Sequence, residues 1–152
     1  MRASSNLLHT ILIVESDTGH QAHINQYVQQ QSAVSLLVMD DIQAALSYLE
    51  MVRRNPTSLP TLLLVNYQDM LNAGYTLLDE LEKRQLKSCI PVIALSDTDD
   101  KNSVEEAYDR GVASYFIKPR AYREWHSFLN LLIQYWFNEV TLPAYRIARQ
   151  GA

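Results

Sequence analysis

The chain contains five short runs of apolar residues, each about the length of one β-strand, and segments with helical patterns separate them. The runs cover residues 10–15, 34–39, 61–66, 91–96 and 113–118. Most of them are nearly continuous in apolar residues, which is typical of strands buried on both faces. Because strands and helices alternate along the chain, we predict a parallel sheet covered by helices on both sides.

The segments between the runs place apolar residues at the spacing of one helix face. Four such stripes are Ile24, Tyr27 and Val28; Ile42, Ala45, Leu46 and Leu49; Leu77, Leu78 and Leu81; and Val104, Ala107 and Tyr108. The proline-containing segment 55–60 should end the second helix before the third strand. Gly111 stands where the C-terminal cap of a helix is expected.

The bulk composition indicates one globular domain that we expect in the cytoplasm. A length of 152 residues suffices for a sizeable core, and the net charge of −4 gives no overall support for nucleic acid binding. No apolar run reaches the ~18 residues that span a bilayer, and the N-terminal run leads into acidic residues instead of a signal-peptide cleavage site. The single cysteine, Cys89, excludes an internal disulfide and fits a reducing compartment.

The polar residues that end the strands should decide the function. In parallel α/β sheets, chemical and ligand sites lie outside the carboxyl ends of the strands. The residues at those ends are Glu15, Ser16, Asp17, Asn66, Ser96 and Lys118. The third run thus ends on an uncharged amide, Asn66.

These strand ends resemble those of a response-regulator receiver domain. The motifs IVES, LLVNYQDMLNAGY, PVIALSD and SYFIKP occur in the family's order, and the resemblance covers about residues 8–137. It implies a doubly wound, flavodoxin-like (βα)5 sandwich whose parallel five-stranded sheet has the order 2-1-3-4-5. It also implies a signalling protein of a two-component or phosphorelay pathway that is not an enzyme.

Two acidic positions of the family's pocket are lost in this chain. Receivers have two acids after the first strand, and here Glu15 matches the first while Ser16 replaces the second. The phosphate-accepting Asp of the family ends the third strand, where this chain has Asn66. An amide cannot form an acyl phosphate, and Mg²⁺ prefers carboxylate oxygens. The resemblance therefore implies a pseudo-receiver without Asp phosphorylation, with weak or absent Mg²⁺ binding and no other cofactor.

The other switch positions of the family are retained. Ser96 matches the hydroxyl position after the fourth strand, and Lys118 matches the lysine that contacts the phosphate. Tyr115 matches the aromatic switch position three residues before that lysine. Pro119 implies the cis Lys-Pro bond that is common in the family.

Several groups could fill the emptied pocket. We expect Lys118 to pair with Glu15 and to hydrogen-bond the Asn66 oxygen, which would hold one internally satisfied state. Asp17 could lean into the pocket as a surrogate acid, but an acid at a helix N-terminus explains it equally well. Asp69 could be a relocated phosphoacceptor, although a solvated loop acid is the much simpler interpretation.

The last helical segment is more apolar than a surface helix requires. One stripe should face the sheet, and it consists of Trp125, Phe128, Leu129, Leu132 and Trp136. Four further apolar residues lie off this stripe, namely Leu131, Ile133, Tyr135 and Phe137. Apolar residues around so much of a helix need a second covering surface.

The C-terminal sequence YWFNEVTLP resembles that of single-domain receivers which partner bacteriophytochrome-type kinases. Those receivers carry a short extension past the last helix and often dimerise through it. We therefore expect a receiver-like domain at 8–137 and an extension at 138–152. The expected homodimer uses Tyr115, Leu131, Tyr135 and Phe137.

The expected function is signalling by contact with a sensor kinase or another signalling protein, without a membrane or nucleic acid partner. About 15 residues follow residue 137, too few for a DNA-binding domain. Two alternatives are a small-ligand-binding flavodoxin-like module that uses the emptied pocket, and a receiver phosphorylated at a relocated acid. Ser96 with Lys118 lacks an oxyanion-hole motif. His20 and His23 share a helix face but lack a third metal ligand, so we expect surface or core roles for them.

Overall fold

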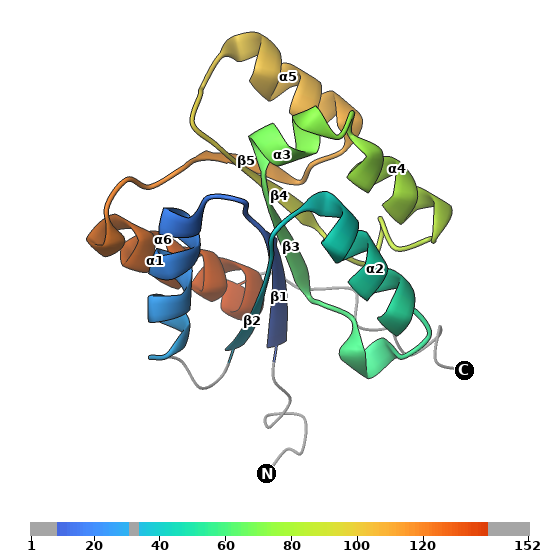
Figure 1. Cartoon of the computed structure of the whole chain (residues 1–152), viewed down its shortest axis with the longest axis horizontal. Helices are drawn as coiled ribbons and strands as arrows, with labels where there is room; N and C mark the ends of the chain where they lie inside the picture. The colour runs from blue at the N-terminus through green and yellow to red at the C-terminus, as the bar shows by residue number, and fades with distance from the viewer. Residues whose placement is uncertain (1–8, 31–33, 140–152) are drawn as a thin grey trace.

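The computed structural model describes residues 9–30 and 34–139. Five strands form one parallel sheet: β1 (His9–Val14), β2 (Val34–Met39), β3 (Leu62–Asn66), β4 (Val92–Ser96) and β5 (Ser114–Ile117). Their order across the sheet is β2-β1-β3-β4-β5 (Figure 1). The five predicted strands and the flavodoxin-like order 2-1-3-4-5 are both confirmed.

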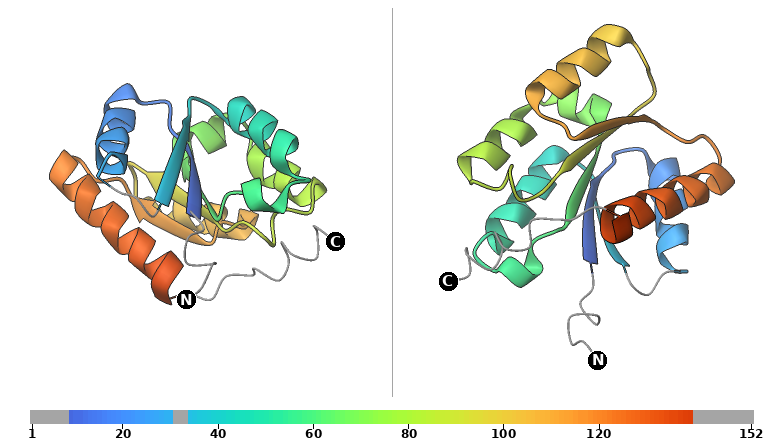
Figure 2. Two further views of the ribbon diagram at one scale, coloured as in Figure 1. Left: turned by 90° about the horizontal axis from the view of Figure 1, so that it is seen from below. Right: turned by 180° about the vertical axis from the view of Figure 1, so that it is seen from behind.

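Helices cover both faces of this sheet, as the views in Figures 1 and 2 show. On one face lie α1 (Thr18–Val28) and α6 (Tyr122–Gln134). On the other lie α2 (Ile42–Val52), α3 (Tyr67–Asn72), α4 (Thr76–Lys83) and α5 (Lys101–Arg110). A short 3-10 helix at Pro56–Ser58 follows α2, and a π-helical turn at Tyr135–Glu139 continues α6.

Strand β3 supplies side chains to a separate core on each face. Leu62 and Leu64 pack in the cluster under α1 and α6, whereas Leu63 and Val65 pack in the cluster under the other helices. All four are fully buried. Burial on both faces removes the need for polar alternation, which explains why this strand is a continuous apolar run in the sequence.

The predicted inward stripe of α6 is confirmed. Trp125, Leu129 and Leu132 are buried, and Phe128 and Trp136 pack partly buried against the same cluster. The helix is amphipathic because these residues recur at three- and four-residue spacing. It therefore docks on the sheet beside α1.

The connection from β3 to β4 contains two helices where the sequence indicated one short stripe. Helix α3 begins at Tyr67, immediately after the strand, and ends at Asn72. Gly74 and Tyr75 then adopt positive φ angles of 65° and 62°, which redirect the chain into α4. Tyr75 is held in this conformation by burial and by a 2.9 Å hydrogen bond between its hydroxyl and that of Tyr67.

Two backbone expectations have opposite outcomes. Gly111 caps α5 with φ at 112°, as predicted. The expectation of a cis Lys118–Pro119 bond is wrong, because no peptide bond within the described residues is cis. A trans bond is the lower-energy form for most residues before proline.

None of the helices in the described part of the chain is long and apolar enough to cross a membrane.

Candidate functional site

Parallel pairing brings the carboxyl ends of the strands to one edge of the sheet. Asn66 lies opposite Leu95, and Ser96 lies opposite Ile117. In the described part of the chain, the buried polar or charged residues are Glu15, Asn66, Ser96 and Lys118. All four stand at these ends, so the buried polarity of the fold is concentrated where the sequence predicted a site.

Glu15 and Lys118 form a buried ion pair. Lys118 Nζ lies 2.7 Å from Glu15 Oε1, and the two side chains are 4% and 1% exposed. The other carboxylate oxygen of Glu15 accepts a 3.0 Å hydrogen bond from the amide of Asp17. The predicted pairing of Lys118 with Glu15 is therefore present, and both carboxylate oxygens have partners.

His20 is a pocket residue that sequence reasoning did not find. Its Nδ1 lies 3.1 Å from Lys118 Nζ and 3.8 Å from Glu15 Oε1. Because an ammonium can only donate, His20 Nδ1 accepts this hydrogen bond. Lys118 thus binds His20 in place of the Asn66 oxygen, with which the structure shows no hydrogen bond. His20 and Lys118 are 98 residues apart in the chain, so no local sequence pattern indicates this contact.

Asp69 is not a solvated loop acid, and that interpretation is wrong. It stands in the first turn of α3, where its side chain is partly buried. Its Oδ2 accepts a 3.0 Å bond from the Asn66 amide and a 3.1 Å bond from the Ser16 backbone N–H. Its Oδ1 accepts a 2.9 Å bond from the Ser16 hydroxyl. Asp69 therefore connects Ser16 with Asn66, the two positions at which the family resemblance implies missing acids.

Asp17 is a helix cap and not a pocket acid. Its carboxylate accepts a 2.9 Å hydrogen bond from the backbone N–H of His20, which makes it the N-cap of α1. The side chain is 55% exposed. The hydrogen bond from His20 is the main reason that the pKa of Asp17 is lowered from its ordinary value. Of the two explanations open from the sequence, the helix N-terminal acid is correct.

Ser96 and Tyr115, which the family resemblance places at switch positions, are both hydrogen-bonded to Thr98. The Ser96 hydroxyl accepts a 3.1 Å bond from the N–H of Thr98, and the Tyr115 hydroxyl donates a 2.7 Å bond to the Thr98 carbonyl. The Tyr115 ring packs edge-on against Tyr67, with centroids 5.5 Å apart. Desolvation by this packing is the main cause of the raised pKa of Tyr115.

The donor groups of the pocket suit Mg²⁺ poorly. The Glu15 carboxylate is neutralised by the Lys118 ammonium, and the Asp69 carboxylate is surrounded by donors from Ser16 and Asn66. Mg²⁺ would have to displace these partners to reach carboxylate oxygens. Within the described residues, no three His, Cys, Asp or Glu side chains are grouped to hold a metal ion.

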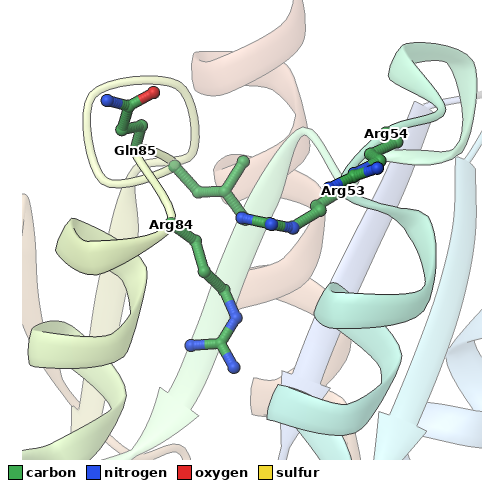
Figure 3. Close-up of a pocket in the computed structure, with 5 residues that line it drawn as sticks. Arg53, Arg54, Arg84 and Gln85 are labelled. Carbon is green, nitrogen blue, oxygen red and sulfur yellow. The ribbon is translucent and has the colours of Figure 1, made fainter.

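A separate hollow lies between the C-terminal ends of α2 and α4 (Figure 3). Arg53, Arg54 and Arg84 line it. Arg84 pairs with Glu80 and, at 2.8 Å, with Glu50, and Arg53 lies 3.3 Å from Glu50. These guanidinium groups lie near the C-terminal ends of two helices. A cation at such an end interacts favourably with the helix dipole and with the last carbonyl groups. Arg84 joins α2 to α4, because it pairs with Glu50 of α2 and Glu80 of α4.

The outer surface of α6 exposes apolar side chains. Leu131 is 68% exposed and Tyr135 is 55% exposed. Phe137 is different, because its ring stacks on His9 at 4.4 Å and it packs partly buried against the core. Tyr115 packs against the core on the opposite face of the sheet from α6. A surface that includes all four residues must therefore wrap around the edge strand β5.

Comparison with known proteins agrees with this geometry. The chain is 26% identical over 147 residues to the response regulator Rcp1 of Synechocystis sp.. The aligned residues cover 95% of this chain and 99% of that protein. It is 25% identical over 127 residues to the probable methanogenesis regulatory protein FilR2 of Methanothrix harundinacea, covering 83% of this chain and 82% of that protein.

The fold also matches solved structures. The structure of the phosphorylated cyanobacterial phytochrome response regulator RcpA superimposes with a TM-score of 0.76 at 23% identity, over 90% of this chain and 99% of that one. The family model described as the response regulator receiver domain matches residues 11–130. This chain therefore belongs to the response regulator receiver domain family.

Proposed function

We propose that this receiver is a pseudo-receiver, a non-enzymatic cytoplasmic protein that signals by protein–protein contact. Its signalling does not use phosphorylation at the end of β3, where the chain has Asn66. Its partner is a sensor kinase or another signalling protein of a two-component or phosphorelay pathway. The observation that carries this proposal is the side chain of Asn66. It ends β3, where the family resemblance places the phosphoacceptor, and its amide donates a hydrogen bond to Asp69.

The surrounding charges support the same proposal. Phosphoryl transfer to a carboxylate depends on metal ions and cations that stabilise the developing charge. Here the Lys118 ammonium is engaged by Glu15 and His20, and Ser16 provides no carboxylate for a metal. RcpA was solved as a phosphorylated protein. We propose that the present chain keeps the scaffold of such a receiver and has lost this modification.

Incubation with acetyl phosphate and Mg²⁺, followed by intact mass measurement, tests the proposal. We expect no change in mass, because an amide oxygen is not an adequate nucleophile for phosphoryl transfer. A receiver that retains its Asp provides the positive control under the same conditions. The gain of one phosphoryl group by this chain would refute the proposal and favour a relocated acceptor such as Asp69.

The double variant S16D/N66D is the companion to this test. Restoring two carboxylates beside Glu15 should raise the affinity for Mg²⁺ at least about tenfold, because each new charge attracts the cation by one or more kcal/mol at pocket distances. Isothermal titration with MgCl₂ measures the change. Unchanged affinity would mean that the pocket positions have been assigned incorrectly.

The two alternative functions have less support from the contacts. A small ligand in the emptied pocket would have to displace existing contacts. Lys118 already pairs with Glu15 and contacts His20. Asn66 already donates a hydrogen bond to Asp69. A relocated acceptor at Asp69 would use a carboxylate whose oxygens accept three hydrogen bonds, which reduces its nucleophilicity. The pseudo-receiver therefore remains our proposal.

We further propose that the protein forms a homodimer through α6 and the edge strand β5. Leu131 of α6 and Tyr135 of the following π-helical turn contribute exposed apolar surface, and Phe116 and Ile117 of β5 are 37% and 50% exposed. Apolar surface of this kind on neighbouring elements is typical of protein interfaces. The expected extension covers residues 138–152, and its residues 140–152 lie outside the described part of the chain.

The variant L131E tests this dimer. Light scattering after size exclusion at micromolar concentration should show a dimer for the unmodified chain and a monomer for L131E, because a carboxylate would be buried without a partner. M51E provides a matched control, since Met51 is 74% exposed on α2, away from this surface. M51E should remain a dimer. A monomeric unmodified chain would contradict the proposal.

A further inference from the structure

Asp69 accepts hydrogen bonds from both substituted positions of the pocket. Ser16 donates to it from its backbone N–H at 3.1 Å and from its hydroxyl at 2.9 Å, and Asn66 donates from its amide at 3.0 Å. The hydroxyl of Ser16 and the amide of Asn66 are donors that an ionised Asp at either position would lack. The two substitutions therefore provide what the Asp69 carboxylate needs.

The position of this carboxylate also matters for access. Its Oδ2 lies 3.0 Å from the terminal nitrogen of Asn66, so any group attached to the end of side chain 66 would compete with an anionic oxygen for the same space. Through Ser16 the same carboxylate also joins the loop after β1 to the first turn of α3, 53 residues further along the chain. Neither a metal ion nor a phosphoryl group is required for these contacts.

We propose that Asp69 is a built-in anionic ligand of the pocket, a positioning residue that fixes the loop after β1 against the end of β3. This inference rests on the proposed function, because it explains how a pocket without phosphorylation keeps one arrangement. Charge-assisted hydrogen bonds are stronger than neutral ones, and three of them converge on one side chain. Ser16, Asn66 and Asp69 act as one unit, so that none of the three is replaceable by itself.

A charge exchange between residues 66 and 69 tests this unit. N66D should lower the melting temperature by about 5 °C, because it removes a donor and places two carboxylates about 3 Å apart. D69N should lower it by several degrees as well. In N66D/D69N the new amide nitrogen at position 69 can donate to the new carboxylate at position 66, and its carbonyl can accept from the Ser16 hydroxyl. The Ser16 N–H loses its acceptor, because it shares Oδ2 of Asp69 with Asn66. Two of the three hydrogen bonds are kept, so the melting temperature should lie at least about 2 °C above that of N66D.

A matched control separates this effect from the general preference of helices for acids in the first turn. Asp79 is an exposed acid in the first turn of α4. D79N should not restore the melting temperature of N66D. All variants are measured with a chelator present, so that Mg²⁺ cannot bridge the carboxylates of N66D. Additive losses in N66D/D69N, or an equal recovery in N66D/D79N, would overturn the inference.

Hydrogen exchange provides a second readout that does not depend on global stability. D69A should accelerate exchange of the Ser16 amide about tenfold or more relative to amides in the core of β3, because that amide loses its acceptor. Unchanged exchange at Ser16 would overturn the inference. These results are distinct from the acetyl phosphate assay, which can refute the proposed function whether or not residues 16, 66 and 69 are coupled.

Discussion

Replacing Lys118 by Met should lower the free energy of unfolding by about 3–5 kcal/mol. The Lys118 ammonium lies 2.7 Å from Glu15, and the side chains are 4% and 1% exposed. Removing the cation leaves a buried carboxylate without its counter-charge and removes a donor from His20. Urea denaturation, with unfolding followed by tryptophan fluorescence, measures the loss.

The double variant E15Q/K118M is the control for this prediction. It removes both charges, and the amide oxygen of Gln can keep the hydrogen bond from the Asp17 N–H. We expect this variant to be more stable than K118M alone, because no buried charge is left unpaired. A loss below about 1 kcal/mol in K118M would show that water replaces the ammonium and that the pair is not a stabilising element.

Replacing Trp125 by Ala should cost about 3–5 kcal/mol in the free energy of unfolding. Trp125 is fully buried in the core under α1 and α6, with its ring 5.5 Å from His20 and 6.2 Å from Phe128. The substitution would leave a large cavity between α6 and the sheet. Urea denaturation followed by circular dichroism measures the effect, since this variant loses a fluorescent side chain.

Two further variants show whether the cost comes from packing. The indole N–H of Trp125 has no hydrogen-bond partner within the described residues. W125F keeps most of the ring volume and removes this unsatisfied donor, so its loss should stay below about 2 kcal/mol. Arg123 is exposed on the same helix, and R123A should change stability by no more than about 0.5 kcal/mol. Equal losses in W125F and W125A would contradict a packing origin.

Continuous apolar runs predicted the strands, helical periodicity predicted the inward stripe of α6, and the family resemblance predicted the order of the strands. Apolar runs and helical spacing can be recognised in the sequence because burial determines which of the consecutive residues are apolar. Helix α3 was not predicted, since it has only six residues and buries only Tyr67 and Met70. So short an element does not establish a helical period. For this reason Asp69 was predicted to be a solvated loop acid, whereas it lies partly buried in the first turn of α3.

The contacts of the candidate site differ in how far they could be foreseen. The family resemblance predicted the pairing of Glu15 with Lys118, because the lysine of receivers pairs with carboxylates of the pocket. His20 joins that pair from the first turn of α1, and its partner Lys118 is 98 residues away in the chain. The angle at which α1 packs on the sheet decides this contact. No local pattern records such an angle.

The sequence by itself determined which groups are present at the carboxyl end of the sheet: one acid, one amide, one hydroxyl and one lysine on buried strand ends. It could do so because strand ends follow directly from the apolar runs. Only the tertiary structure decided how these groups are paired, because hydrogen bonds between segments depend on distances that folding creates. Asn66 thus faces Asp69 and not Lys118, and the pocket is satisfied by side chains of its own chain.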